Sequence, residues 1–182
     1  MHEKEEMEPG SWIALTNPTA SEILEIADAC QIDPDHLKAP LDEEERSRIE
    51  AEDEYTLILV DIPAIEIRHD QRTYTTIPLG IILTQDIIVT VCTEDTPVLQ
   101  NFVRSRVKEF STKKKLRFVY QILYRTAAIY QANLRIIDKR RTEIEERVGS
   151  DTDDSDLINL HELESTLVYF ATSLRANGVV LD

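Results

Sequence analysis

The chain has 182 residues, with 35 Asp and Glu against 20 Lys and Arg and a formal net charge of −15 at pH 7. This charge argues against a general nucleic-acid binder and against adhesion to anionic lipid surfaces, because both need clustered basic residues. A hydrophobic content of 42% is enough for a sizeable core and argues against global disorder.

The N-terminal segment, residues 1–10, is acidic, ends in Pro9-Gly10 and lacks the apolar region of a signal peptide. We expect it to be a disordered tail. No stretch approaches the roughly 18 apolar residues that a membrane span requires, so the chain as given is expected to be soluble. Cys30 and Cys92 form no C-x-x-C pair, which favours a reduced compartment with both thiols in the core.

The first elements are a short strand and two helices. Ser11–Leu15 is predicted to be a strand in which Trp12 is a large core anchor. Thr19 and Glu22 have the spacing of a capping box, which predicts a helix that ends near position 31. A second, short helix is predicted over Pro34–Lys38, and Pro40 is expected to end it.

A series of strands follows. Ser47–Ala51 and Tyr55–Ile62 are predicted to be consecutive strands, and the second is almost continuously apolar, as in a strand buried on both faces. The segment Arg68–Arg72 is predicted to be a loop before a hairpin of Tyr74–Leu83 and Ile87–Cys92. Strands and helices mixed in this way predict an α/β or α+β layered domain over residues 11–110.

Helices dominate the rest of the chain, residues 111–182, after a short helix marked by Val98, Phe102, Val103 and Val107. The segment Thr112–Val148 has no Gly or Pro, and its apolar and near-apolar residues alternate at spacings of four and three, as in a coiled coil, with only Arg141 breaking the series. They are Leu116, Tyr120, Leu123, Ala127, Tyr130, Leu134, Ile137, Ile144 and Val148. A turn over Gly149–Asp156 precedes a helix with Leu160, Leu163, Leu167, Phe170 and Leu174 at matching spacing. The two long helices are predicted to pair as an antiparallel hairpin.

No catalytic motif is visible, and we expect neither an enzyme nor a resident cofactor. The sequence lacks glycine-rich phosphate loops, and no nucleophile–base pair can be assigned from spacing. His36 is the only histidine near several aspartates, namely Asp33, Asp35 and Asp42. Carboxylates suit magnesium or calcium, so a cation site is one interpretation, with Asp35 and Asp42 as candidate ligands. An ordinary polar surface at a helix end is the other.

The order of these parts resembles a known family. SWIAL at position 11 is followed by the capped helix, Ile32-x-Pro34-x-x-Leu37, RIEAEDEY from position 48, and LGIILTQDIIVTV from position 79. Tyr120-x-x-Leu123 then lies near the start of the long helix. Together they resemble the N-terminal cytosolic domain of the CorA-type divalent-cation transporters.

The resemblance implies a layered α/β/α sandwich around a mixed sheet, followed by an acidic antiparallel helical hairpin. It also implies that the full-length protein is a pentamer at the cytoplasmic face of the cell membrane. In the family, two membrane helices with a Gly-Met-Asn motif follow, and magnesium, cobalt, nickel or zinc is transported. Magnesium bound between cytosolic domains holds the channel closed. Contact with the membrane is expected only through a C-terminal part that this chain does not contain.

The chain departs from the family at the position of a regulatory metal ligand. There the family's acid is replaced by Ala39, which follows Lys38, and neither side chain can ligate a cation. Asp35 and Asp42 are the neighbouring acids that can substitute. The acid-rich segments Asp42–Glu54 and Glu143–Asp156 are expected to carry charge-based gating, although acids can also simply solvate an exposed turn. The alternatives are a free-standing α/β protein with a hairpin for partner binding or oligomerisation, and a small enzyme of unrecognised type.

Overall fold

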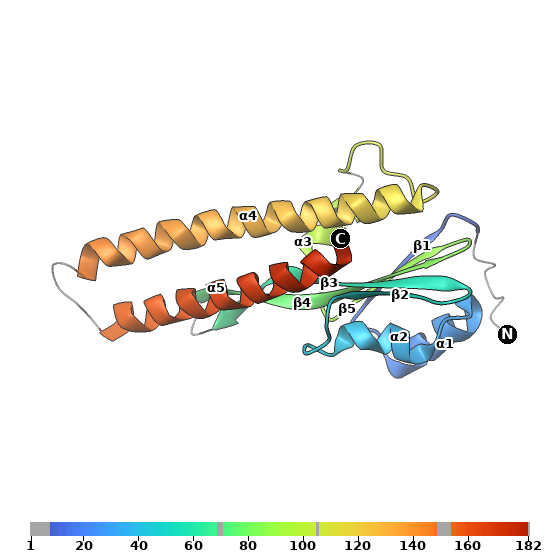
Figure 1. Cartoon of the computed structure of the whole chain (residues 1–182), viewed down its shortest axis with the longest axis horizontal. Helices are drawn as coiled ribbons and strands as arrows, with labels where there is room; N and C mark the ends of the chain where they lie inside the picture. The colour runs from blue at the N-terminus through green and yellow to red at the C-terminus, as the bar shows by residue number, and fades with distance from the viewer. Residues whose placement is uncertain (1–7, 69–70, 105, 149–153, 182) are drawn as a thin grey trace.

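A five-stranded mixed sheet forms the centre of the fold (Figure 1). The structure is a computed structural model that describes residues 8–68, 71–104, 106–148 and 154–181. The strands lie in the order β1-β5-β4-β3-β2, with β1 parallel to β5 and every other neighbouring pair antiparallel. The strands are β1 (Trp12–Thr16), β2 (Arg48–Ala51), β3 (Tyr55–Arg68), β4 (Gln71–Thr84) and β5 (Ile88–Cys92). The helices are α1 (Ala20–Cys30), α2 (Pro34–Lys38), the 3-10 helix η1 (Ala39–Leu41), α3 (Pro97–Val103), α4 (Lys115–Val148) and α5 (Asp154–Leu181).

Helices cover both faces of this sheet, which confirms the predicted layered sandwich. In Figure 1, α1 and α2 lie on one side of the sheet, and α3, α4 and α5 lie on the other. Successive side chains of a strand point to opposite faces, so Leu57 and Leu59 of β3 pack towards α1 and α2, while Ile58 and Val60 pack towards the long helices. All four are buried, which confirms that this apolar run is covered on both sides.

The first two helices begin where their capping residues predict. The Thr19 hydroxyl accepts a hydrogen bond from the Glu22 N–H at 3.3 Å, and the Glu22 carboxylate accepts one from the Thr19 N–H at 2.7 Å. This reciprocal capping box starts α1. The Asp33 side chain caps α2 by accepting from the Asp35 N–H at 2.8 Å, and Pro34 occupies the first turn.

The hairpin of β3 and β4 is longer than its apolar pattern predicts. Each strand has 14 residues, so the expected loop at Arg68–Arg72 is wrong at both ends. Its central residues, 69–70, lie outside the described part of the chain. The polar end of the hairpin is held by the long helices, because Tyr74 of β4 is buried among Tyr130 of α4 and Phe170 of α5.

In the first third of α4, the buried residues are not those of the predicted coiled-coil seam, the row of apolar residues at spacings of four and three. Leu116 and Tyr120 are 68% and 69% exposed, whereas Phe118, Val119 and Ile122 are buried against the sheet. The reason is that this part of α4 packs on the sheet and on Trp12, so its buried face is set by that layer. The seam is correct further along, where the side chains of Tyr130, Ile137 and Ile144 are buried.

The buried face of α5 is also different from the prediction. Leu167 and Leu174 are 38% and 41% exposed, while Thr166, Ser173 and Asn177 are buried. These polar side chains are buried because they hydrogen-bond the sheet. Thr166 donates to the Tyr74 carbonyl at 3.1 Å, and Ser173 donates to the Thr76 hydroxyl at 2.9 Å.

Two further boundaries differ from the prediction. The helix after Pro97 ends at Val103, which is exposed, so Val107 is not part of it. The turn predicted over Gly149–Asp156 is shorter, because α5 already begins at Asp154; residues 149–153 lie outside the described residues. The helices α4 and α5 run antiparallel, as expected, and project beyond the end of the sheet (Figure 1).

Candidate cation site

The acidic segment Asp42–Glu54 follows the edge of the sheet. It contains eight carboxylates and two arginines, and it runs from the end of η1 through β2 into the turn before β3. Because β2 is the last strand of the sheet, one of its sides has no neighbouring strand. Six of the eight acids are exposed, and Glu45 and Glu50 are half-buried. The segment therefore presents a negative surface at one edge of the domain.

Close packing fixes η1 beside this segment. Pro40 is buried against β4 at Gly80, where an added Cβ atom would lie 2.3 Å from the Pro40 Cγ atom. Any side chain at position 80 would thus push η1 away from the sheet. The Ala39 methyl group packs against the core under α1 and α2. Ala39 therefore contributes to the core and supplies no ligand atom.

The two candidate ligands from the sequence lie on either side of Ala39. Asp35 is an exposed residue in the first turn of α2, and its carboxylate pairs with the Lys38 ammonium at 3.0 Å. Asp42 follows η1, and its carboxylate accepts a hydrogen bond from the Glu44 N–H at 3.0 Å. Neither belongs to a group of three close ligands among the described residues. Their role as cation ligands stays a prediction.

A different set of possible ligands comes together beside them. Within the described part of the chain, His36, Glu50 and Glu52 are the one group of three whose ligand atoms all lie within 4.8 Å of one another. The His36 Nε2 atom is 3.1 Å from a Glu50 carboxylate oxygen. His36 is on α2, Glu50 on β2 and Glu52 in the turn before β3.

Two neighbouring side chains orient this group. The Tyr55 hydroxyl lies 2.7 Å from the His36 Nδ1 atom and accepts a hydrogen bond from the Asp33 N–H at 3.2 Å. Burial raises the pKa of Tyr55, and the nearby carboxylates of Glu52 and Glu50 raise it further, so the hydroxyl stays protonated near neutral pH. The Arg48 guanidinium holds the other oxygen of Glu50.

The sequence interpretation singled out His36 but did not bring Glu50 and Glu52 to it. Aspartates near His36 in the chain suggested a site, whereas Glu50 on β2 and Glu52 in the following turn are 14 and 16 positions away. One signal was available for Glu50, because residues 48 and 50 of a strand share one side. The missing information was that α2 lies over that side.

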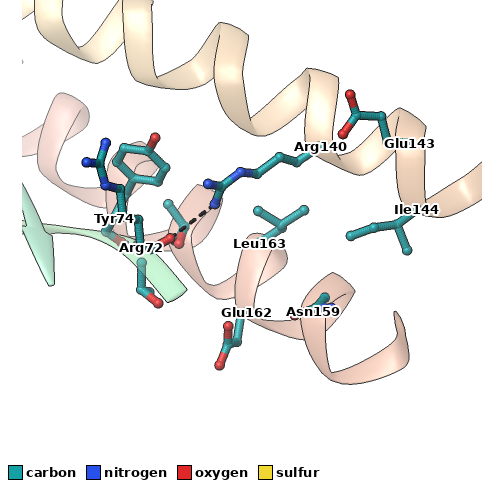
Figure 2. Close-up of a pocket in the computed structure, with 10 residues that line it drawn as sticks. Arg72, Tyr74, Arg140, Glu143, Ile144, Asn159, Glu162 and Leu163 are labelled. Atoms are coloured by element: carbon teal, nitrogen blue, oxygen red, sulfur yellow. Dashed lines mark hydrogen bonds between the residues drawn. The ribbon is translucent and has the colours of Figure 1, made fainter. Parts of the chain in front are cut away.

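A second polar region lies between the long helices and the start of β4. Figure 2 shows Arg72, Arg140, Glu143 and Glu162 around a cavity of about 540 Å³. The Arg140 guanidinium donates to the Arg72 carbonyl at 3.1 Å. Two cations and two anions line the cavity, so it favours neither an anion nor a cation, and we assign it no ligand.

The buried cysteine, Cys92, is not a candidate nucleophile. Cys92 lies at the end of β5, and its thiol donates a hydrogen bond to the Glu94 carbonyl at 3.0 Å. Burial raises the pKa of Cys92 to about 11, so the thiol is protonated at neutral pH and acts as a small core residue.

The match to a family model defines the class of protein. The sequence model of the CorA-like Mg2+ transporter protein family matches residues 9–182, and the chain belongs to this family. The family is one of membrane transporters and not of enzymes. Among the described residues, none of the helices combines the length and apolar character that a membrane crossing needs.

The relatives narrow this assignment. The chain is 26% identical over 179 residues to the cobalt/magnesium transport protein CorA of Methanocaldococcus jannaschii, covering 93% of this chain and 53% of that protein. The chain therefore spans about half the length of this curated relative. The solved soluble domain of the same CorA superposes with a TM-score of 0.80 at 25% identity, covering 91% of this chain and 66% of that one.

A more distant structure supports the fold alone. The ZntB cytoplasmic domain from Vibrio parahaemolyticus superposes with a TM-score of 0.66 at 12% identity, covering 91% of this chain and 64% of that one. The layered sandwich and the helical hairpin are thus common to proteins with little sequence in common.

Proposed function

We propose that this chain is the regulatory domain of a divalent-cation transporter and lies at the cytoplasmic face of the membrane. The observation that carries the proposal is the family match over residues 9–182, which includes the whole sheet and both long helices. The transported ion is magnesium or cobalt, as the name of the Methanocaldococcus jannaschii relative states for that protein, with zinc as a further candidate. The full-length protein is a homo-oligomer, and we expect a pentamer.

The acidic edge supplies a mechanism for regulation. When two copies bring their Asp42–Glu54 segments together, like charges repel, and screening limits this repulsion to about 8 Å at physiological ionic strength. Divalent cations that bind between the copies remove the repulsion, because carboxylate oxygens are the ligands that magnesium prefers. When the cation concentration falls, the copies separate and the population shifts towards the open transporter.

Asp35 and Asp42 are our candidates for ligands that face a neighbouring copy. Both are exposed, and both lie beside Ala39, where the family's ligand is replaced by a methyl group that packs into the core. Carboxylates at an exposed helix start and at the end of η1 can reach a cation shared with another chain. The segment Glu143–Asp156 would add to the negative surface, although its centre lies outside the described residues.

Limited proteolysis tests this function on the chain as it exists. We expect millimolar magnesium to slow cleavage within Asp42–Glu54 relative to EDTA, because bridging protects this edge. A variant that neutralises exposed acids, Asp42→Asn with Glu43→Gln and Glu44→Gln, should lose that protection. Equal cleavage rates of the parent chain in magnesium and in EDTA would contradict the proposal.

A further inference from the structure

We propose that His36, Glu50 and Glu52 form a binding site for a transition-metal ion within a single chain. The ligand atoms are one imidazole nitrogen and two carboxylate oxygens, all within 4.8 Å of one another. The site is distinct from Asp35 and Asp42, and it needs no neighbouring copy. Its existence is therefore independent of the regulatory function proposed above.

The backbone brings the three ligands together from separate elements. Glu50 lies on β2 opposite Leu57 of β3, and Leu57 is buried under α1 and α2, so Glu50 is on the sheet face that α2 covers. Glu52 lies in the turn two residues further on, and its carboxylate is close to the possible ligand atoms of His36 and Glu50. The Glu52 N–H donates to the Tyr55 carbonyl at 2.9 Å, which fixes the turn. His36 reaches the pair from α2, which Asp33 caps.

Outer contacts hold the ligands in position, as is usual around metal ligands. The Tyr55 ring packs edge-on to the His36 ring, with the centroids 5.7 Å apart, and its hydroxyl contacts Nδ1. This leaves Nε2 pointing towards Glu50 and Glu52. Arg48 binds one oxygen of Glu50 and leaves the other facing His36. Two of the three ligands are therefore oriented before any ion binds.

The donor set indicates the class of ion. An imidazole nitrogen suits zinc, cobalt or nickel, whereas magnesium prefers oxygen ligands and an octahedral shell. Bonds of about 2.0–2.2 Å to a tetrahedral ion place neighbouring ligand atoms about 3.3 Å apart. The His36–Glu50 separation of 3.1 Å is slightly shorter than this value, and rotation of the exposed Glu52 side chain brings in the third ligand. Water completes the shell.

Binding requires a particular tautomer of His36. The metal takes the Nε2 lone pair, so the ring proton sits on Nδ1 and is donated to the Tyr55 oxygen. In the other tautomer, Nε2 carries the proton and can donate it to the Glu50 carboxylate, 3.1 Å away. The side chains occupy the same positions in both tautomers, and a bound ion selects the tautomer in which Nε2 is free of a proton.

Titration of the chain with cobalt(II) tests the site. We expect one ion per chain, a visible absorption spectrum with nitrogen coordination, and affinity at least about tenfold higher than for magnesium. Glu52→Gln and His36→Gln should each weaken cobalt binding by about tenfold or more. Glu54→Gln removes an exposed acid of the same turn that is outside the group and should bind cobalt like the parent chain.

Three results would overturn the proposal. One is the absence of saturable cobalt binding near one ion per chain. Another is unchanged binding in Glu52→Gln, which alters an exposed residue and should leave the fold intact. The third is an equal loss in Glu54→Gln, because that would show diffuse attraction to the acidic surface.

Discussion

Replacing Asn177 by leucine is expected to destabilise the fold, because this side chain completes the open edge of β3. The β2–β3 ladder ends at the pair Arg48 and Leu59, so Asp61 lies beyond it. Asp61 pairs with Pro78 of β4, but its N–H and C=O both point away from β4, towards α5. Asn177 of α5 replaces the missing strand: its Oδ1 atom accepts from the Asp61 N–H at 2.7 Å, and its Nδ2 atom donates to the Asp61 carbonyl at 2.8 Å.

The size of the effect follows from the groups that lose a partner. Leucine leaves the Asp61 N–H and the Ser47 hydroxyl without Asn177, while the Asp61 carbonyl keeps the Tyr130 hydroxyl at 3.1 Å. A buried polar group without a partner costs about 1–3 kcal/mol. Asp61 is half-buried, so water partly compensates, and we expect a total loss of about 2–4 kcal/mol.

Urea unfolding followed by circular dichroism measures this loss. Arg175→Leu is the matched control, because Arg175 is exposed on the same helix and its change should stay within about 0.5 kcal/mol. If Asn177→Leu unfolds at the same urea concentration as this control, α5 does not complete the sheet edge in the way described.

Two further predictions concern the sheet. Gly80→Ala should destabilise the fold by about 1–3 kcal/mol, because its Cβ atom would meet Pro40. Gly178→Ala is the control: no atom of another part of the chain lies within 4 Å of the added Cβ, so this change should be neutral or stabilising. Equal stabilities of the two variants in thermal melts would contradict this packing. Stability should fall between about pH 9 and about pH 11 by about 2 kcal/mol, since the unfolded Cys92 thiol ionises while the folded one, with a pKa of about 11, stays protonated. Below pH 9 both states are protonated and the effect disappears; a Cys92→Ala variant with the same alkaline slope would refute the assignment.

Local signals were sufficient for much of the fold. The capping box of Thr19 and Glu22 and the Pro34 start predicted α1 and α2, because both depend on contacts within a few residues. The apolar run Tyr55–Ile62 predicted a strand covered on both faces. The buried face of α5 was not predictable in this way, since Ser173 and Asn177 are polar and are buried only because they bond to strands about a hundred residues earlier.

In the candidate site, too, features set by neighbouring residues were predictable and features set by distant contacts were not. The sequence indicated His36 as the histidine with acidic surroundings, and it indicated that position 39 carries a methyl group. It did not indicate that Glu50 and Glu52 approach His36, because that depends on how α2 lies over the edge of the sheet. The role of Tyr55 was equally hidden, since a tyrosine at the start of an apolar strand is normally a core residue.

Sedimentation velocity of this chain in EDTA and in millimolar magnesium tests the central claim most directly. If cations bridge the acidic edges of neighbouring copies, the sedimentation coefficient rises with magnesium in the parent chain. The variant that neutralises Asp42, Glu43 and Glu44 should instead give the same value in both buffers. A parent chain whose sedimentation coefficient is the same with and without magnesium would contradict cation-dependent association.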